Sequence, residues 1–144
     1  SIEKIYSGAF SSSGLESITI PDNVKQIVGS SYNGGAFGSC KNLRTVTIGN
    51  GTEAIGEATF ADCENLKTVN IGKGIKHIGK NAFRYCSSLT IVTIGVEKLA
   101  YGKKITIRGE DYFPGYGKDV FLGCSALSLK DRKKIRDTGY TGEF

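Results

Sequence analysis

The chain has 144 residues, of which 39% are hydrophobic and 20 are glycine, and it carries a net charge of +5 at pH 7. This length suits a single domain, and the absence of a long apolar run predicts no membrane-spanning helix. A basic protein attracts polyanions, but the basic residues are spread along the chain without a stripe interleaved with aromatic residues. We therefore expect no nucleic-acid binding.

Phenylalanine marks a repeat that runs through most of the chain. Phe37, Phe60 and Phe83 follow one another at intervals of 23 residues, Phe10 stands 27 residues before the first of them, and Phe121 stands 38 after the last. Around these positions the same columns recur: cysteine or serine three residues after the phenylalanine, leucine further on, then an apolar-polar-apolar triplet. Self-similarity at a fixed period is the signature of a repeat architecture.

The triplets predict short strands, because apolar and polar residues alternate in them and a glycine or proline follows directly. Segments 46–48, 69–71 and 92–94 are examples. One coil of 23 residues cannot bury its own apolar face, but stacked coils can, with each strand pairing in parallel with the next. We expect an α/β repeat solenoid of about five coils.

Three departures from the period are visible. The first unit is one residue short, the stretch 28–35 holds five extra residues, and an insertion at 97–118 separates the fourth unit from the fifth. The chain begins inside a coil, so we expect a fragment, or a mature form that lacks a leader or upstream coils. The open edge of such a first coil is expected to be able to pair with another copy.

Residues 128–144 predict a helical cap over the last coil. Ser128 and Asp131 form a capping-box-like pattern, and the helical stretch ends near Gly139. The basic residues of this helix are interpreted as a solvated outer face. Four apolar side chains are expected to cover the last coil: Leu129, Ile135, Tyr140 and Phe144.

The frame A-F-x-x-C-x-x-L-x-x-V-x-I, present in Ala36–Ile48 and Ala82–Ile94 and with threonine first in Thr59–Ile71, resembles the BspA-like (Treponema pallidum-type) leucine-rich repeat. The ending GYTGEF looks like the tail of such proteins from gut Bacteroides and their relatives. The resemblance covers about 2–96 and 120–144, and it leaves out 97–118. It implies a right-handed solenoid with a parallel sheet on one face, located on the outside of a bacterial cell and active in adhesion or protein binding.

The cysteines occupy one inward column. Cys40, Cys63, Cys86 and Cys124 each follow a phenylalanine by three residues, and Ser13 takes this place in the first unit. Side chains in register point the same way, which disfavours disulfide geometry. A metal site is not expected, because no C-x-x-C pair exists. We predict a ladder of buried thiols that pack as small hydrophobic groups.

The single histidine, His77, shares its column with Lys4, Gln26 and Ala54. A position that accepts all four residue types is expected to be exposed and without common chemistry. Without a second histidine, a Ser-His-Asp or Cys-His arrangement has no support. We expect no enzymatic activity and no cofactor.

Two surfaces are candidates for binding. The first is the exposed face of the strands, which is small, rich in hydroxyl groups and nearly uncharged. It is either the ordinary preference of threonine for strands or a concave polar platform for a partner. Its candidate binding residues are Thr45, Thr47, Thr68, Asn70 and Thr93, with Ser17, Thr19 and Ile91 in the same rows.

The second surface is the insertion, since insertions in repeat arrays form loops that often bind partners. Tyrosine and arginine are enriched at binding hot spots, but the rings are equally expected to fold back and pack a small satellite core. The candidate residues are Tyr101, Lys104, Arg108, Tyr112, Phe113 and Tyr116.

Together these features favour a non-catalytic binding or adhesion module at a bacterial cell surface. The expected partner is a protein of a host, of a neighbouring cell surface or of the matrix, and a membrane would be reached only through a tether outside this chain. Two alternatives remain open. One is a carbohydrate-binding module that uses Tyr112, Phe113 and Tyr116 as stacking platforms, and the other is a structural spacer for another domain.

Overall fold

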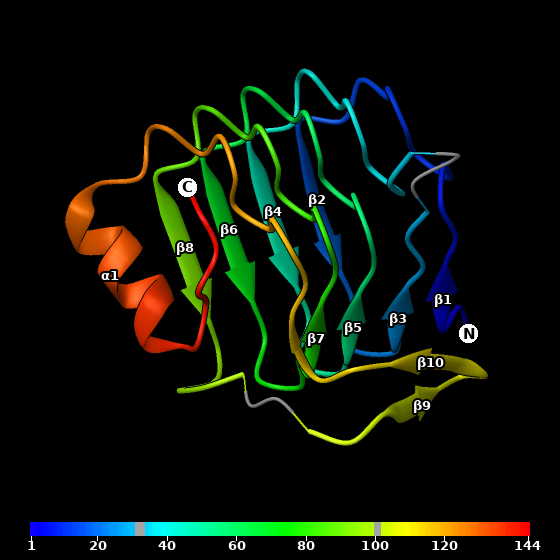
Figure 1. Ribbon diagram of the computed structural model, residues 1–144. Coiled ribbons are helices and arrows are strands. Elements are labelled where there is room, and N and C mark those ends of the chain that lie inside the picture. The colour runs from blue at the N-terminus through cyan, green and yellow to red at the C-terminus, as the bar shows by residue number, and fades with distance from the viewer. Residues whose placement is uncertain (31–33, 100–101) are drawn as a thin grey trace.

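The computed structural model describes residues 1–30, 34–99 and 102–144. The chain winds through stacked coils whose strands lie side by side from one coil to the next (Figure 1). The apolar-polar-apolar triplets form a parallel four-stranded sheet in the order β2-β4-β6-β8, as expected for a leucine-rich repeat solenoid. Its strands are β2 (Ser17–Ile20), β4 (Thr45–Ile48), β6 (Thr68–Ile71) and β8 (Ile91–Ile94).

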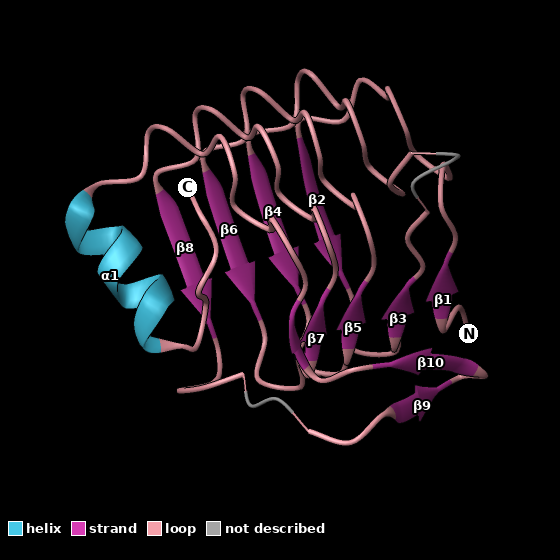
Figure 2. Ribbon diagram, viewed as in Figure 1, coloured by secondary structure: helices cyan, strands magenta, loops and turns pink. Residues whose placement is uncertain are grey.

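A second parallel sheet, which the sequence analysis did not predict, has five two-residue strands. Figure 2 shows the loops that connect the strands of the two sheets and the helix at the end of the stack. The second sheet has the order β1-β3-β5-β7-β11. Its strands are β1 (Lys4–Ile5), β3 (Gln26–Ile27), β5 (Ala54–Ile55), β7 (His77–Ile78) and β11 (Gly115–Tyr116).

Strand β11 corrects the bounds of the insertion. Tyr116 pairs with Ile78 and Gly115 with His77, so residues 115–116 belong to the fifth coil, although the sequence analysis placed them in the insertion at 97–118. The signal was present in the sequence. Tyr116 stands five residues before Phe121, just as Ile78 stands five before Phe83.

Glycine follows the last residue of β5, β7 and β11 because successive coils approach closely there. A Cβ atom on Gly56 would lie 2.1 Å from the amide nitrogen of Gly29, and one on Gly117 would lie 2.3 Å from that of Lys80. Real Cβ contacts are never this short, so the repeated Ile-Gly pair of the sequence has a steric cause.

Stacked phenylalanines run along the core. The ring centroids of Phe10, Phe37, Phe60 and Phe83 follow one another at 5.1, 5.2 and 5.3 Å, and the last is 5.6 Å from Phe121. The planes are within 10° of parallel, because each coil repeats the conformation of the coil before it. Every ring except the first is fully buried.

The predicted thiol ladder is confirmed. All four cysteines are buried and free. Each thiol donates to the carbonyl of the phenylalanine in the preceding coil, at 3.2 Å from Cys63 to Phe37 and 3.1 Å from Cys124 to Phe83. In each coil the thiol therefore supplies a hydrogen bond to a buried backbone carbonyl that water does not reach.

The helix α1 (Leu129–Asp137) ends the stack. The hydroxyl of Ser128 accepts a hydrogen bond from the amide of Asp131 and caps the helix, as predicted. Ile135 and Tyr140 are buried against the last coil, but Leu129 is 84% exposed, so its predicted place in the cap is wrong. Leu129 stands six residues before Ile135, and at about 100° per residue the two side chains point in directions more than a quarter turn apart around the helix axis. Leu129 therefore faces away from the last coil. No helix of the described residues is long and apolar enough to cross a membrane.

Candidate functional site

The outward face of the four-stranded sheet is the more regular of the two candidate surfaces. Val46, Ile48, Val69 and Ile71 point inward and are buried, while the residues between them are exposed or half-buried. The parallel register aligns the outward residues in two rows across the strands. The rows are Ser17-Thr45-Thr68-Ile91 and Thr19-Thr47-Asn70-Thr93.

These rows bring together the five strand-face residues that the sequence analysis singled out. Neighbouring strands of a sheet lie about 4.8 Å apart, so four strands place hydroxyl and amide groups at regular intervals over about 14 Å. None of the eight side chains is charged. A partner that docks here would exchange hydrogen bonds with water for bonds to threonine hydroxyls, and no ionised group would need to be desolvated.

A margin of positive charge borders this strand face. Arg44 and Lys67 are exposed and occupy equivalent places just before β4 and β6. Within the described part of the chain, neither side chain forms a salt bridge. The sequence analysis did not single them out, although their shared column, which begins with Glu16, was available as a signal.

The insertion forms an antiparallel hairpin of β9 (Ile105–Ile107) and β10 (Glu110–Tyr112). Arg108 and Gly109 connect the strands with φ angles of 49° and 86°, as a type I′ hairpin turn requires. The hairpin extends beside the five-stranded sheet toward the first coil (Figure 1).

Ion pairs hold the turn of the hairpin to the first coil. The guanidinium of Arg108 lies 3.1 Å from the carboxylate of Glu3, and Lys4 lies 3.8 Å from Glu110. Within the hairpin, Lys104 lies 2.8 Å from Asp111 and lowers the pKa of that carboxyl. The two cations predicted as partner contacts, Lys104 and Arg108, are thus engaged in pairs within the chain.

Tyr112 packs against the column that contains His77. Its ring centroid lies 5.0 Å from that of His77, and its hydroxyl accepts a hydrogen bond from the side-chain amide of Gln26. Gln26 and Ala54 are fully buried and His77 is half-buried. The prediction that this column is exposed is therefore wrong. A position that accepts several residue types can still be buried, and here the insertion covers the column.

His77 also contacts the backbone of the insertion. Its Nδ1 lies 2.7 Å from the carbonyl oxygen of Phe113. Burial lowers the pKa of the imidazole below its ordinary value, and the contact with the Phe113 carbonyl partly offsets this. The ring is accordingly neutral at physiological pH.

The aromatic residues of the insertion do not gather into one platform. Tyr116 is 7% exposed and packs against Phe121 and Tyr140. Phe113 is 68% exposed, while Tyr112 faces the five-stranded sheet. Tyr101 lies outside the described residues. Of the three rings expected to stack on a sugar, only Phe113 is presented to solvent, because the other two pack within the chain.

This architecture is similar to that of known leucine-rich repeat proteins. The model of the BspA type leucine rich repeat region matches residues 3–105 in six copies. A leucine rich cell surface protein from Faecalibacterium prausnitzii A2-165 superposes with a TM-score of 0.66 at 25% identity, over 99% of this chain and 34% of that protein. The chain thus spans about a third of the length of that protein.

The T. pallidum leucine rich repeat protein superposes with a TM-score of 0.52 at 21% identity, over 98% of this chain and 78% of that protein. This likeness concerns the fold alone. No curated protein matches the chain.

Proposed function

The chain belongs to the BspA type leucine rich repeat family, and from this premise we propose that it is a non-catalytic module that binds a partner protein at a bacterial cell surface. The similar protein from F. prausnitzii is described as a cell surface protein, which supports the location. The proposed role is adhesion to a protein of a host, of the matrix or of a neighbouring cell.

The observation that carries the proposal is the strand face. Its two rows contain eight uncharged side chains in register, six of which carry a hydroxyl group and one an amide. Hydroxyl and amide groups both donate and accept, so they satisfy the mixed polar surface of a protein. The exposed Arg44 and Lys67 at the margin would attract an acidic partner and raise its association rate.

Phe113 contributes to a second, separate contact surface. Its ring stands on the hairpin beside the five-stranded sheet, whereas Thr47 and Asn70 belong to the outward face of the four-stranded sheet. Lys104 and Arg108 remain available to this second surface only if their pairs with Asp111 and Glu3 open. We therefore assign the main contact to the strand face.

The test is a binding screen at physiological salt. The chain is presented to a panel of extracellular-matrix proteins and to a glycan panel, beside the double variant Thr47→Lys and Asn70→Lys. Lysine at these neighbouring positions introduces charge and bulk in the centre of the face without touching the core. The control is Ser87→Lys, an exposed position in the turn after Cys86.

We expect the double variant to lose at least tenfold in affinity for any protein that the wild type binds, since central contacts dominate interfaces, and the control to bind unchanged. Equal binding by all three proteins would refute the strand face as the site. Binding of glycans alone would favour the carbohydrate-binding alternative. Failure to bind any ligand would favour the spacer.

A further inference from the structure

Strand β8 ends the four-stranded sheet and has one unpaired edge. The amides of Ile91 and Gly95 donate to carbonyls of the preceding coil, Lys67 at 3.1 Å and Ile71 at 2.8 Å. Alternate residues of a parallel strand direct their N–H and C=O groups to opposite sides. Val92 and Ile94 therefore turn these groups away from β6, and no backbone group in the described ranges bonds them.

Helix α1 lies beside this edge but does not close it. The two elements contact each other, and a groove of about 260 Å³ remains between them. Val92, Thr93 and Ile94 line one side, and Lys134, Ile135 and Thr138 line the other. The apolar side chains of Val92 and Ile94 are half-buried, so the groove offers backbone donors and acceptors between partly covered apolar groups.

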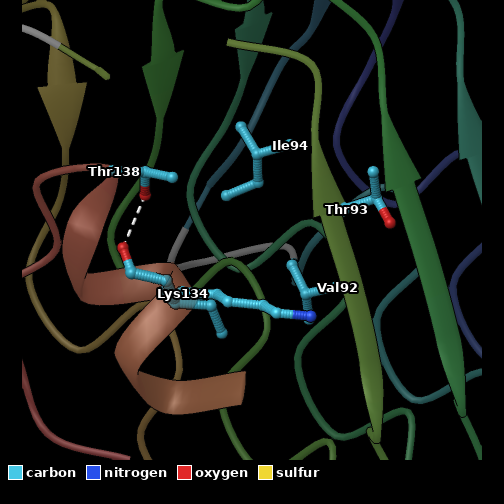
Figure 3. A pocket seen from close by; sticks show the side chains of 6 residues that line it. Val92, Thr93, Ile94, Lys134 and Thr138 are labelled. Atoms are coloured by element: carbon cyan, nitrogen blue, oxygen red, sulfur yellow. Dashed lines mark hydrogen bonds between the residues drawn. The ribbon is translucent and has the colours of Figure 1, made fainter. Parts of the chain in front are cut away.

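Lys134 is the cation of α1 that points at the groove. Figure 3 shows its side chain extending from the helix toward β8, beside Val92. Lys133 and Arg136 of the same helix are engaged elsewhere: Lys133 pairs with Asp137 at 2.8 Å and Arg136 donates to the carbonyl of Gly142 at 3.1 Å. Lys130 is exposed and does not line the groove. The side-chain ammonium of Lys134 has neither an ion pair nor a hydrogen bond with any described residue.

We propose that this groove binds an extended acidic peptide segment of a partner protein. The segment adds as a further strand to β8, its backbone bonds the free N–H and C=O groups of Val92 and Ile94, and a carboxylate side chain contacts Lys134. An edge strand with unpaired groups is a template for such addition. The charge of Lys134 selects an acidic segment over a basic one.

The site is distinct from the strand face. The groove shares Thr93 with the outward row of the strand face, but its bonding groups are the edge N–H and C=O groups of Val92 and Ile94. The two assignments are therefore tested by different variants. With two residues of backbone pairing and one exposed ion pair, the affinity of a short peptide is expected to be about millimolar.

The experiment is a titration of the full chain, labelled with nitrogen-15, followed through its amide resonances. The probe is acetyl-Thr-Val-Asp-Val-Thr-amide. Two matched peptides accompany it: one has lysine in place of aspartate, and the other carries N-methyl groups on alternate residues, which removes the amide donors of one edge. The variants are Lys134→Glu and Lys80→Glu, the second an exposed charge reversal away from the groove.

We expect the probe to shift the amides of Val92 and Ile94 and to slow their hydrogen exchange. The variant K134E should weaken the aspartate peptide about fivefold and strengthen the lysine peptide by a similar factor, as for an exposed ion pair. K80E should change neither. The amide spectrum of each variant reports independently that it is folded.

Three results would overturn the proposal. The first is the absence of any shift at Val92 and Ile94 up to 10-fold above the expected millimolar range. The second is equal binding of the N-methylated peptide, which would exclude backbone pairing. The third is equal weakening by K134E and K80E, which would reduce the effect to net charge.

Discussion

At the scale of single residues, the cysteine column shows how one side-chain atom serves each coil. The Cys63 thiol donates to the Phe37 carbonyl at 3.2 Å in a fully buried position. Burial raises the pKa of this thiol to about 12, so it stays protonated and able to donate across the physiological range. The residue is a structural donor, and its chemistry as a nucleophile is suppressed.

Substitutions of Cys63 should distinguish the contribution of its hydrogen bond from that of its side-chain packing. We expect Cys63→Ala to lower the free energy of unfolding by about 1–3 kcal/mol, because the Phe37 carbonyl loses its partner in a dry position. Cys63→Ser keeps a donor and should cost less. Urea unfolding of the two variants measures the difference, and equal losses would mean that packing alone explains the column.

Left-handed residues recur on both sides of the phenylalanine in each coil. Ala58 has φ 55°, a conformation that costs a residue with a Cβ about 1–2 kcal/mol. Glycine adopts this conformation without that cost, but it lowers stability by about 0.5–1 kcal/mol because it loses more conformational entropy on folding. We expect Ala58→Gly to stabilise the protein by about 0.5–1 kcal/mol in the same urea assay.

The matched control for this prediction is Ala61→Gly, which changes a half-buried alanine three residues later that is absent from the left-handed set. It should destabilise the protein by about 0.5–1 kcal/mol. If both variants destabilise the protein alike, the left-handed backbone at residue 58 carries no strain.

At the scale of elements, we expect the contact between hairpin β9–β10 and His77 to make stability depend on pH. His77 lies under Tyr112 and against the carbonyl of Phe113, and burial lowers the pKa of its imidazole. In the unfolded chain the imidazole has a pKa of about 6.5. Between that value and the lower folded value, the unfolded state binds more protons, so stability falls as pH decreases.

We therefore expect the free energy of unfolding contributed by His77 to be fully present above about pH 6.5 and to be lost progressively as the pH falls toward the folded pKa. The variant His77→Gln, which places in this column the residue found at Gln26, should remove that part of the pH dependence. Unfolding curves at pH 7 and pH 5 measure it. If the wild type and the variant lose the same free energy of unfolding between pH 7 and pH 5, the pH dependence belongs to groups other than His77.

At the scale of the whole molecule, the two ends of the solenoid differ. Helix α1 and Tyr140 cover the last coil, whereas the first coil presents Ile2, Tyr6 and Phe10 with exposed fractions of 69%, 60% and 42%. These side chains border an apolar groove of about 490 Å³. The outer edges of β1 and β2 lie at the same end. Apolar surface next to unpaired strand edges favours association.

We expect this chain to associate through its first coil as its concentration rises, and the double variant Ile2→Lys and Tyr6→Lys to remain monomeric. The control is Leu129→Lys, since Leu129 is also a large exposed hydrophobic side chain but lies on the cap at the other end of the solenoid. Sedimentation velocity at several concentrations distinguishes the three proteins. A wild type that stays monomeric throughout, or a control that also abolishes association, would contradict this assignment.

The sequence by itself determined the repeat, the parallel four-stranded sheet, the thiol ladder and the capped end. These features are periodic or local. A column such as Cys40, Cys63 and Cys86 repeats the same environment, and the capping pattern of Ser128 involves residues only three apart. The pairing of Thr47 with Asn70 also follows from the period, because one coil places each strand beside the next.

Only the tertiary structure decided the course of the insertion, the cover over the His77 column and the open edge of β8. The contact of Arg108 with Glu3 joins residues 105 positions apart, and that of Tyr112 with Gln26 joins residues 86 apart. No periodic signal encodes such pairs, because the insertion occurs once and its partners depend on where the hairpin comes to lie. The gap between β8 and α1 likewise arises from how two elements pack, which no residue pattern within either element specifies.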